Sequence, residues 1–430
     1  MRKIKNILRR IRLVYRPSLP VLKLVVLVMV VVCTVTLVIL GAAIHTGQKR
    51  NQEDLQRLEI LQQENRELTR RIGEIGSVQS VVRIAREELG LENPDAVIFE
   101  PVETTEATEP TETEPPETEP PQPESFLLTF TGDCTFGGTP ARVNAETGFL
   151  KVVGDNYDYP FQNVRQYFEN DDYTLINLEQ AMGDKGYPVD KKWTFRGPAE
   201  YTQVMTGSSV EFVTIANNHS YDFGKEGYEQ TREILEEAGI VYTESYKSVT
   251  VTTGRGLTIA IYAVDASLSA MDKEQMVTDI TQLKESGVEV IIAAFHWGYE
   301  NNFRSNSAQQ ELGKAAIDAG ANIVWGHHPH VLQPIEEYNG GIIYYSLGNF
   351  AFGGNSVPKD HDTAVLQQEI IREPDGSIHL GKLTIIPCSV SSIKERNNFQ
   401  PTPYEEGSEE YKRVLSKLDG TYGGPNLAIG

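Results

Sequence analysis

The stretch IVWGHHPHVLQPIEEYNGGIIYYSLGNF, residues 323–350, decides the fold of this 430-residue chain. Residues 323–325 are apolar and predict a short buried strand, which ends in Gly326 and the histidine-rich segment 327–330. Further on, residues 335–338 and 341–345 flank Asn339-Gly340, a dipeptide typical of a tight β-hairpin. The stretch therefore predicts polar side chains at the end of one strand, followed directly by an antiparallel pair.

The sequence on either side of this stretch predicts a large α/β domain over residues 125–430. Apolar runs alternate with amphipathic helical stretches, a pattern that favours a mostly parallel sheet. A second hairpin signal, Pro374-Asp375-Gly376, adds antiparallel strands near the end. We expect a two-sheet sandwich flanked by helices, with strands at 126–131, 174–178, 212–216, 257–264, 288–295, 363–371 and 378–386 and helices at 224–238, 272–286 and 308–319.

Five of the predicted strands end in residues that can bind metals or move protons. In α/β sheets, ligands gather beyond the carboxyl ends of strands, so we expect these ends to converge. Oxygen and imidazole donors without thiolate suit Mn, Fe, Zn or Mg. The five endings are Gly132-Asp133, Asn177-Leu178-Glu179, Asn217-Asn218-His219 with Asp222, His296-Trp297-Gly298, and Gly326-His327-His328-Pro329-His330.

The order of these motifs is similar to that of the CapA family within the calcineurin-like metallophosphoesterase superfamily. The matching segments are TGD, NLE, ANNHSYDFG, FHWGYE and GHHPHVLQPIE with YSLGNF, and they cover residues 126–390. The resemblance implies a fold that binds two divalent ions. It also implies a role in making or anchoring a poly-γ-glutamate capsule.

Carried over by motif, the resemblance implies a role for each polar strand end. Two ions in this arrangement activate a water and stabilise both oxygens of a displacement reaction. His219 would be the general acid or a hydrogen-bond donor to the transition state, oriented by Asp222, and Arg196 would hold an anionic substrate. The implied metal ligands are Asp133 for the first ion, Glu179 as the bridge, Asn218, His296 and His328 for the second ion, and His330 for the first.

The histidine-rich segment allows a further expectation about side-chain direction. Pro329 disfavours a helical backbone at His328 and favours an extended one. Alternate residues of an extended chain face the same side, so His328 and His330 can converge. His327 would then point away, toward supporting residues or the surface.

The sequence departs from the superfamily pattern at the first ion. The first motif usually offers Asp-x-His, whereas here it is Asp133-Cys134-Thr135, and the bridging Asp is replaced by Glu179. The first ion would have fewer protein ligands and be weak, labile or absent.

Each of these residues also has an ordinary structural interpretation. A carboxylate caps turns or pairs with a base, an asparagine occupies turns, and a buried histidine packs as a ring. These alternatives are a turn cap for Asp133, an ion pair for Glu179, a turn for Asn218, packed rings for His219, His296, His328 and His330, and structural ion pairs for Asp222 and Arg196.

The N-terminal region predicts a membrane anchor. Residues 1–23 are basic, and residues 24–44 form an uncharged apolar run close to the roughly 20 residues needed to span a bilayer. The positive-inside bias places the N-terminus in the cytoplasm and the C-terminal domain outside the cell. A cleaved signal peptide is the alternative, because small residues follow at 41–43.

The segments between anchor and domain predict a stalk and a spacer. Residues 47–76 carry a heptad seam with Asn65 at an a position, which favours a paired coiled coil over a lone helix and hence a homodimer. The anchor, the seam and the segment 77–102, with AREELGL at 85–91 and apolar residues at 97–99, together resemble the septum-formation-initiator family of division proteins over about residues 20–100. A generic dimerising stalk is the alternative. Residues 103–124 are nearly all Glu, Thr and Pro, which favours a disordered spacer of about 70 Å.

The composition of the chain excludes some classes of function and leaves others open. The net charge of −21 argues against nucleic acid as a partner. Three cysteines do not form a disulfide framework, so Cys134 and Cys388 are expected as buried thiols, with a bridge between them as the alternative. Three functions stay open: a metal-dependent hydrolase or transferase acting on an anionic phosphoester or γ-glutamyl substrate, a binding module for such a polymer, and a structural division-associated protein.

Overall fold

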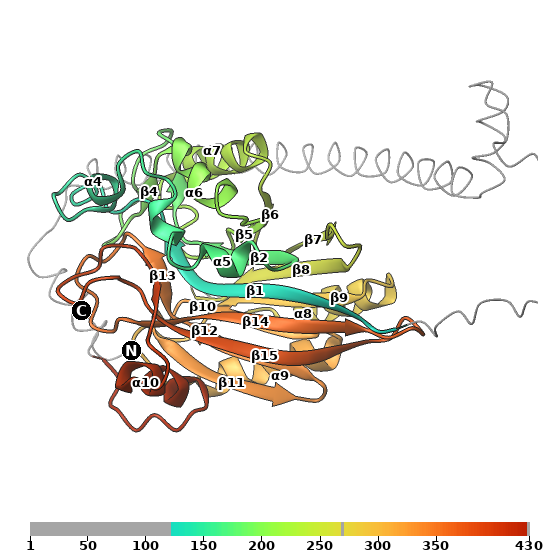
Figure 1. The fold of residues 1–430 in the computed structure, drawn as a ribbon. Coiled ribbons are helices and arrows are strands. Elements are labelled where there is room, and N and C mark those ends of the chain that lie inside the picture. Colours follow the sequence, from blue (N-terminus) through green and yellow to red (C-terminus); the bar gives the residue numbers. More distant parts are fainter. Residues whose placement is uncertain (1–121, 268–270, 428–430) are drawn as a thin grey trace, which may run out of the picture. The chain divides into compact units, whose positions relative to one another are not determined.

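A computed structural model describes residues 122–267 and 271–427, and Figure 1 shows them as two packed sheets with helices outside. The first sheet has eight strands. Its order is β16 (Thr402–Pro403), β15 (Ile378–Ser389), β14 (Asp362–Arg372), β1 (Glu124–Thr135), β2 (Tyr173–Leu178), β5 (Phe212–Thr214) and β6 (Val241–Thr243), and β13 (Asn349–Phe352) pairs with β1. Its parallel neighbours β1, β2, β5 and β6 come from the first part of the domain.

The second sheet has six strands, with a parallel centre and antiparallel edges. β8, β9, β10 and β12 are parallel neighbours, whereas β7 and β11 close the two edges in the antiparallel sense. Its order is β11 (Leu332–Tyr338), β12 (Gly341–Leu347), β10 (Ile323–His327), β9 (Val290–His296), β8 (Thr258–Asp265) and β7 (Lys247–Thr252).

The apolar side chains divide into three layers that hold the sandwich together. One core cluster joins the facing sides of the two sheets, and Phe130 of β1 packs edge-on against Trp325 of β10 and Tyr344 of β12. The other two clusters bury helices on the outer faces. These helices are α4 (Phe149–Val153), α5 (Arg165–Phe168), α6 (Thr202–Thr206) and α7 (Gly224–Glu237) on the first sheet, and α8 (Lys273–Glu285) and α9 (Ser307–Ala319) on the second.

The predicted two-sheet sandwich flanked by helices is confirmed for the described residues. The hairpin at Asn339-Gly340 is also confirmed, because both residues have positive φ (48° and 81°) and join β11 to β12. The sequence analysis missed the short pair β3 (Ala181–Met182) and β4 (Arg196–Gly197) and helix α10 (Glu409–Leu418). It also missed β6, β7, β13, β16, α4, α5 and α6. These elements are short or lie outside the alternating pattern.

Several predictions lie outside the described residues. They are the basic tail 1–23, the membrane helix 24–44, the coiled coil 47–76, the segment 77–102 and the spacer 103–124 up to residue 121. Within 122–267 and 271–427, no helix combines the length and apolarity that crossing a membrane requires.

Strand register brings the polar strand ends to one edge of the sandwich. In the first sheet, Asp133 is aligned with Asn177 of β2 and with Asn349 of β13. In the second sheet, His296 of β9 is aligned with His327 of β10. Because parallel strands end at the same edge, both sheets present their ligand residues toward the same place.

Gly132 allows the first of these residues to reach its position. A Cβ at Gly132 would lie 2.1 Å from the Gly348 carbonyl oxygen, and the neighbouring Asp133 N–H donates to that same oxygen at 2.8 Å. Only glycine permits this approach of β1 to the residue before β13.

Gly132→Ala is therefore expected to lower the free energy of unfolding by about 1–3 kcal/mol, because the methyl group forces β1 away from Gly348. Gly254→Ala is the matched control, since its Cβ would point into open space, and it should change stability by less than about 0.5 kcal/mol. Urea unfolding of the full-length chain measures both. Equal stability of the two variants would contradict the close approach.

Candidate metal centre

The centre of the polar cluster is the carboxylate of Glu179, directly after β2. This side chain is 0% exposed, and neither of its oxygens has a hydrogen-bond partner. Burial raises the pKa of Glu179 well above its usual range, and the negative charge of Asp133 raises it further. A buried carboxylate without donors costs several kcal/mol unless a cation or a proton compensates it. Glu179 thus marks a position where positive charge is required.

Three imidazoles from different segments face one oxygen of Glu179. Its Oε1 lies 3.6 Å from His296 Nε2, 3.7 Å from His330 Nε2 and 3.8 Å from His219 Nε2. His296 ends β9 and His330 follows β10, both in the second sheet, whereas His219 follows β5 of the first sheet. The two sheets therefore supply nitrogen donors to the same carboxylate.

His296 Nε2 lies at the spacing of shared metal ligands from three other donor atoms. His296 Nε2 lies 3.0 Å from Asn218 Oδ1 and 3.2 Å from His328 Nδ1, in addition to 3.6 Å from Glu179 Oε1. Ligands that share an ion at bond lengths near 2.0–2.2 Å stand roughly 3–3.6 Å apart. These residues fit a metal ion, and Asp133, Glu179 and His296 also offer ligand atoms within 4.8 Å of one another.

Two of the histidines are held neutral, as metal ligands must be. Burial lowers the pKa of His328 to about 3, and the neighbouring His330 adds to this shift. Burial and the adjacent His328 lower the pKa of His296 well below its usual range. Both rings therefore keep a lone pair available at neutral pH.

Asp133, the residue implied for the first ion, already has its oxygens engaged. Oδ1 accepts from Asn177 Nδ2 at 2.9 Å and lies 2.8 Å from His327 Nδ1, while Oδ2 lies 3.2 Å from His330 Nδ1. Burial raises its pKa, but the His327 and His330 contacts outweigh burial and hold it well below its usual range. Asp133 thus stays ionised and is satisfied by protein donors.

His330 lies between the two carboxylates. Its Nδ1 also lies 3.0 Å from Asn349 Oδ1, on the strand beside Asp133. Burial lowers the pKa of His330, but Glu179 and Asp133 outweigh burial and raise it to about 10. Without metal, a protonated His330 supplies the positive charge between Asp133 and Glu179.

The backbone of the histidine-rich segment differs from the prediction. His328 and His330 have φ of 94° and 56°, so the extended backbone expected from Pro329 is wrong. Of the two outcomes expected for His327, the surface position is wrong and the supporting one agrees with the structure, because its ring is buried and contacts Asp133. Left-handed conformations cost these residues about 1–3 kcal/mol each. They turn the chain tightly enough for the rings of His327, His328 and His330 to face the cluster.

His219 and Asp222 form a pair beside the metal ligands. His219 Nδ1 lies 2.6 Å from Asp222 Oδ2, and its ring packs against Phe195. Burial lowers the pKa of His219, against the opposing effect of Asp222. Asp222 also accepts from the Phe195 N–H at 2.6 Å and from Lys191 Nζ at 3.0 Å. The carboxylate therefore fixes the ring so that Nε2 faces Glu179.

The sequence analysis missed several residues of this cluster. Lys191 also donates to the Asn218 carbonyl at 2.8 Å, although nothing in the Lys191-Lys192 segment singles it out. Asn217 donates to Asn177 at 3.0 Å, which in turn donates to Asp133. Asn177 and Asn217 lie inside the NLE and ANNHSYDFG motifs, so their position next to predicted ligands could have identified them.

The structure places Arg196 apart from this cluster. Its guanidinium donates to the backbone carbonyls of residues 184–186 and lies 3.4 Å from the centre of the Phe223 ring. Burial lowers its pKa. These contacts leave Arg196 as a clamp on the 184–186 segment, in place of the expected substrate contact. Arg142 and Lys359 are the basic residues that line the metal cavity.

The cluster opens into a cavity of about 300 Å³. His219, His330, Asn349, Trp193, Arg142 and Glu300 are among the residues that line it. Thr135 stands where the Asp-x-His pattern has its histidine, and its hydroxyl donates to the Glu179 carbonyl oxygen at 3.0 Å. The Cys134 thiol is buried directly after Asp133, and burial raises its pKa, so it is no thiolate ligand. Cys134 and Cys388 are both free, as expected from the sequence.

Glu179→Gln tests the metal ligands. The full-length parent is expected to retain about one equivalent of Mn²⁺ after dialysis, whereas the variant loses it because the neutral amide cannot compensate the ion's charge. Glu300→Gln removes an exposed carboxylate from the same cavity and should keep the ion. Elemental analysis measures metal per chain. Equal retention in all three proteins would contradict the assignment.

Comparison with known proteins gives the family. A PGA biosynthesis protein CapA of Bacillus subtilis is 28% identical over 314 residues, covering 68% of this chain and 80% of that one. A capsule biosynthesis protein CapA of Bacillus anthracis is 27% identical over 305 residues, covering 64% and 72%. A solved Haemophilus influenzae NAD nucleotidase is 13% identical, with TM-score 0.35 and coverage of 70% and 63%, too weak a likeness to interpret. Residues 127–354, more than half of the chain, match the family model of the bacterial capsule synthesis protein PGA_cap, and the chain belongs to that family.

Proposed function

We propose that this chain is a metal-dependent hydrolase or transferase that acts on an anionic cell-envelope substrate during synthesis or anchoring of poly-γ-glutamate. The observation that carries the proposal is the buried carboxylate of Glu179, whose oxygens accept no hydrogen bond, with the imidazoles of His296 and His219 within 4 Å and the His219–Asp222 pair beside it. The names of the two Bacillus relatives, which refer to capsule and PGA biosynthesis, support the capsule context.

The residues divide into a binding group and a proton-transfer group. Glu179, Asn218, His296 and His328 would hold a divalent ion, which supplies charge stabilisation and an activated water. His219 is oriented through Nδ1 by Asp222, so Nε2 is the atom at which a proton is taken up or given. Asp133 and His330 would serve a second, weaker ion only if their mutual contact opens.

We also propose a cellular location, a membrane anchor with the domain outside the cell, and this part rests on the sequence alone. Residues 24–44 anchor the chain with its N-terminus in the cytoplasm, and residues 103–124 carry the domain outward. The coiled coil 47–76 pairs two chains, and residues 77–102 act with it as a division-like stalk.

One observation favours a second candidate function. Thr135 stands where the usual first motif has its histidine, and the oxygens of Asp133 are satisfied by Asn177, His327 and His330. A site with one complete ion position suits a module that binds or anchors the polymer without turning it over.

His219→Gln separates the two functions. In an enzyme, loss of the proton-transfer group should lower kcat by about 10²- to 10⁴-fold while metal content stays at the parent level. His379→Gln, an exposed histidine on β15, is the control and should behave as the parent.

The assay is turnover of phosphoesters and γ-linked glutamate polymers by the full-length, metal-loaded chain. Equal kcat for parent and His219→Gln would contradict the role of His219. Metal-dependent polymer binding with no turnover in the parent would support the binding module instead.

A further inference from the structure

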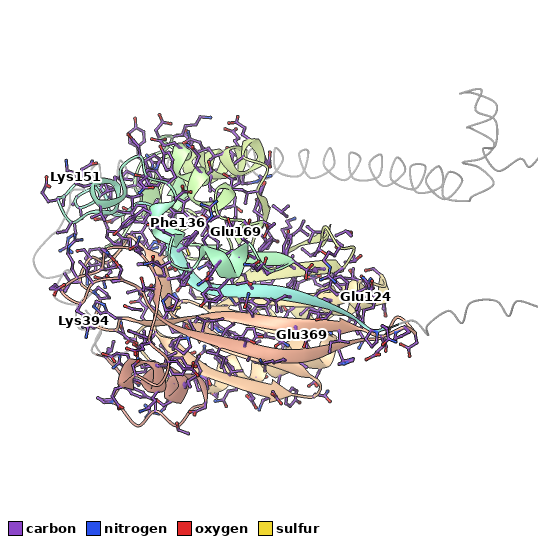
Figure 2. All side chains as sticks on the ribbon, in the orientation of Figure 1. Glu124, Phe136, Lys151, Glu169, Glu369 and Lys394 are labelled. Atoms are coloured by element: carbon purple, nitrogen blue, oxygen red, sulfur yellow. The ribbon has the colours of Figure 1, made fainter. Side chains whose placement is uncertain are left out.

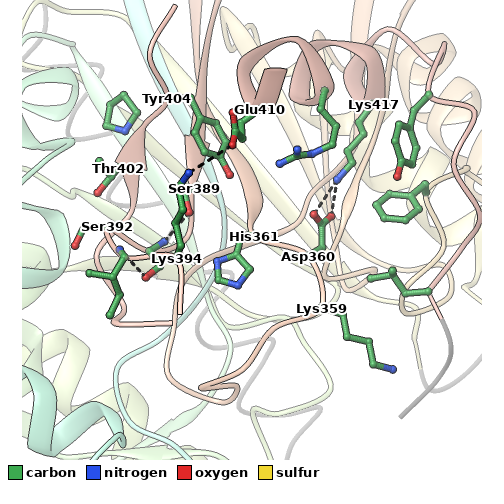
Figure 3. Close-up of a pocket in the computed structure, with 17 residues that line it drawn as sticks. Lys359, Asp360, His361, Ser389, Ser392, Lys394, Thr402, Tyr404, Glu410 and Lys417 are labelled. Atoms are coloured by element: carbon green, nitrogen blue, oxygen red, sulfur yellow. Dashed lines mark hydrogen bonds and ion pairs between the residues drawn. The ribbon is translucent and has the colours of Figure 1, made fainter. Parts of the chain in front are cut away.

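A second cavity adjoins the metal cavity. It has a volume of about 510 Å³ and lies between residues 359–361, the ends of β15 and β16, and α10 (Figure 3). Lys359, Asp360 and Leu427 line both cavities, so the two share one wall. Neither the family's motifs nor the metal ligands account for this second cavity.

The floor of the second cavity is a closed network of charges. Lys417 is 2% exposed, and its Nζ donates to Asp360 Oδ1 at 2.8 Å and to Asp362 Oδ2 at 2.7 Å. Arg413 donates twice to Asp362, both at 2.7 Å. Burial raises the pKa of Asp362, but Arg413 and Lys417 outweigh burial and lower it. The acids of the floor are thus neutralised and do not repel an anion.

The rim carries the charge that remains for a ligand. The Lys394 side chain is 93% exposed, and its Nζ lies 4.0 Å from Glu410 Oε1, a spacing at which an exposed pair contributes little. Figure 2 shows Lys394 at the end of the sandwich opposite Glu124, the residue where β1 begins. Lys394 therefore lies toward the end at which β1 delivers Asp133.

The sign of the local charge is opposite to that of the whole chain. Among the described residues, Lys359, Lys394, Arg413 and Lys417 line the second cavity, against Asp360 and Glu410, with Asp362 beneath the floor. Four cations thus meet three acids here, and His361 adds a titratable ring, whereas the chain has 60 acidic and 39 basic residues. An anionic ligand would find this part of the surface more favourable than the average one.

Resting on the proposed function, we infer that the two cavities form one continuous path for a polymer of repeated carboxylates. The metal cavity holds the unit next to Glu179 and His219, and the second cavity holds the neighbouring units beyond Lys359 and Asp360. Ser389, Ser392 and Thr402 line this second part and offer polar surface to a polymer backbone. Occupying both cavities makes affinity depend on polymer length.

The test is isothermal titration calorimetry on the full-length chain, purified in detergent and loaded with Mn²⁺. γ-Linked glutamate oligomers of two and of ten units are the probes. The ten-unit oligomer should bind the parent more tightly than the two-unit one. Lys394→Glu should weaken the ten-unit oligomer by about threefold to tenfold and leave the two-unit oligomer unchanged.

Lys247→Glu on β7 is the matched control, because it makes the same charge reversal at an exposed lysine outside both cavities. It should bind both oligomers as the parent does. If the parent binds both oligomers equally and the two variants behave alike, the second cavity is no subsite although the proposed substrate stands. If the parent binds neither oligomer, the carboxylate-polymer substrate and the inference built on it both fail.

Discussion

The buried carboxylate of Glu179 is the constraint on which the rest of the site depends. Its oxygens have no hydrogen-bond donor, so folding places a carboxyl group where water cannot stabilise its ionised form. The histidine rings around this carboxyl group differ in charge. His296 and His328 are kept neutral by burial, whereas His330 is kept protonated by Asp133 and Glu179. A metal ion bound at Glu179 would therefore supply the positive charge that protons on the cluster supply in the metal-free protein.

The sandwich is what brings these groups together. Glu179 follows β2 of one sheet, whereas His296 ends β9 and His330 follows β10 of the other. Phe130, Trp325 and Tyr344 lock the two sheets face to face, and the Trp325 indole also donates to the Thr131 carbonyl just before Asp133. The packing that stabilises the domain thus also sets the separation of the ligands. The positive φ of His328 and His330 is the local strain that this arrangement maintains.

Much of the fold followed from local sequence. Alternation of apolar runs and amphipathic stretches predicted the sandwich, and Asn339-Gly340 predicted its hairpin, because both signals act over a few residues. The convergence of the strand ends could also be predicted, since parallel strands end at one edge. The residues brought together there include Asp133, Glu179, Asn218, His219, Asp222, His296, His328 and His330.

What could not be predicted depends on contacts between distant segments. Tertiary contacts set the backbone conformation at His328 and override the extended conformation that Pro329 favours locally. Lys191 reaches Asp222 from a loop without a pattern, and Arg196 is taken up by carbonyls that only the folded 184–186 segment presents. The second cavity likewise forms only because α10 packs against β14 and β15, and no sequence motif predicts this packing.

Anomalous diffraction from crystals grown with Mn²⁺ tests the central claim most directly, because it locates the ion without relying on turnover. The account predicts a peak at bonding distance from Glu179 Oε1, His296 Nε2, His328 Nδ1 and Asn218 Oδ1. Any second peak, near Asp133 and His330, should be weaker. Absence of a peak at Glu179, with its carboxylate instead paired to a protein donor, would contradict the account.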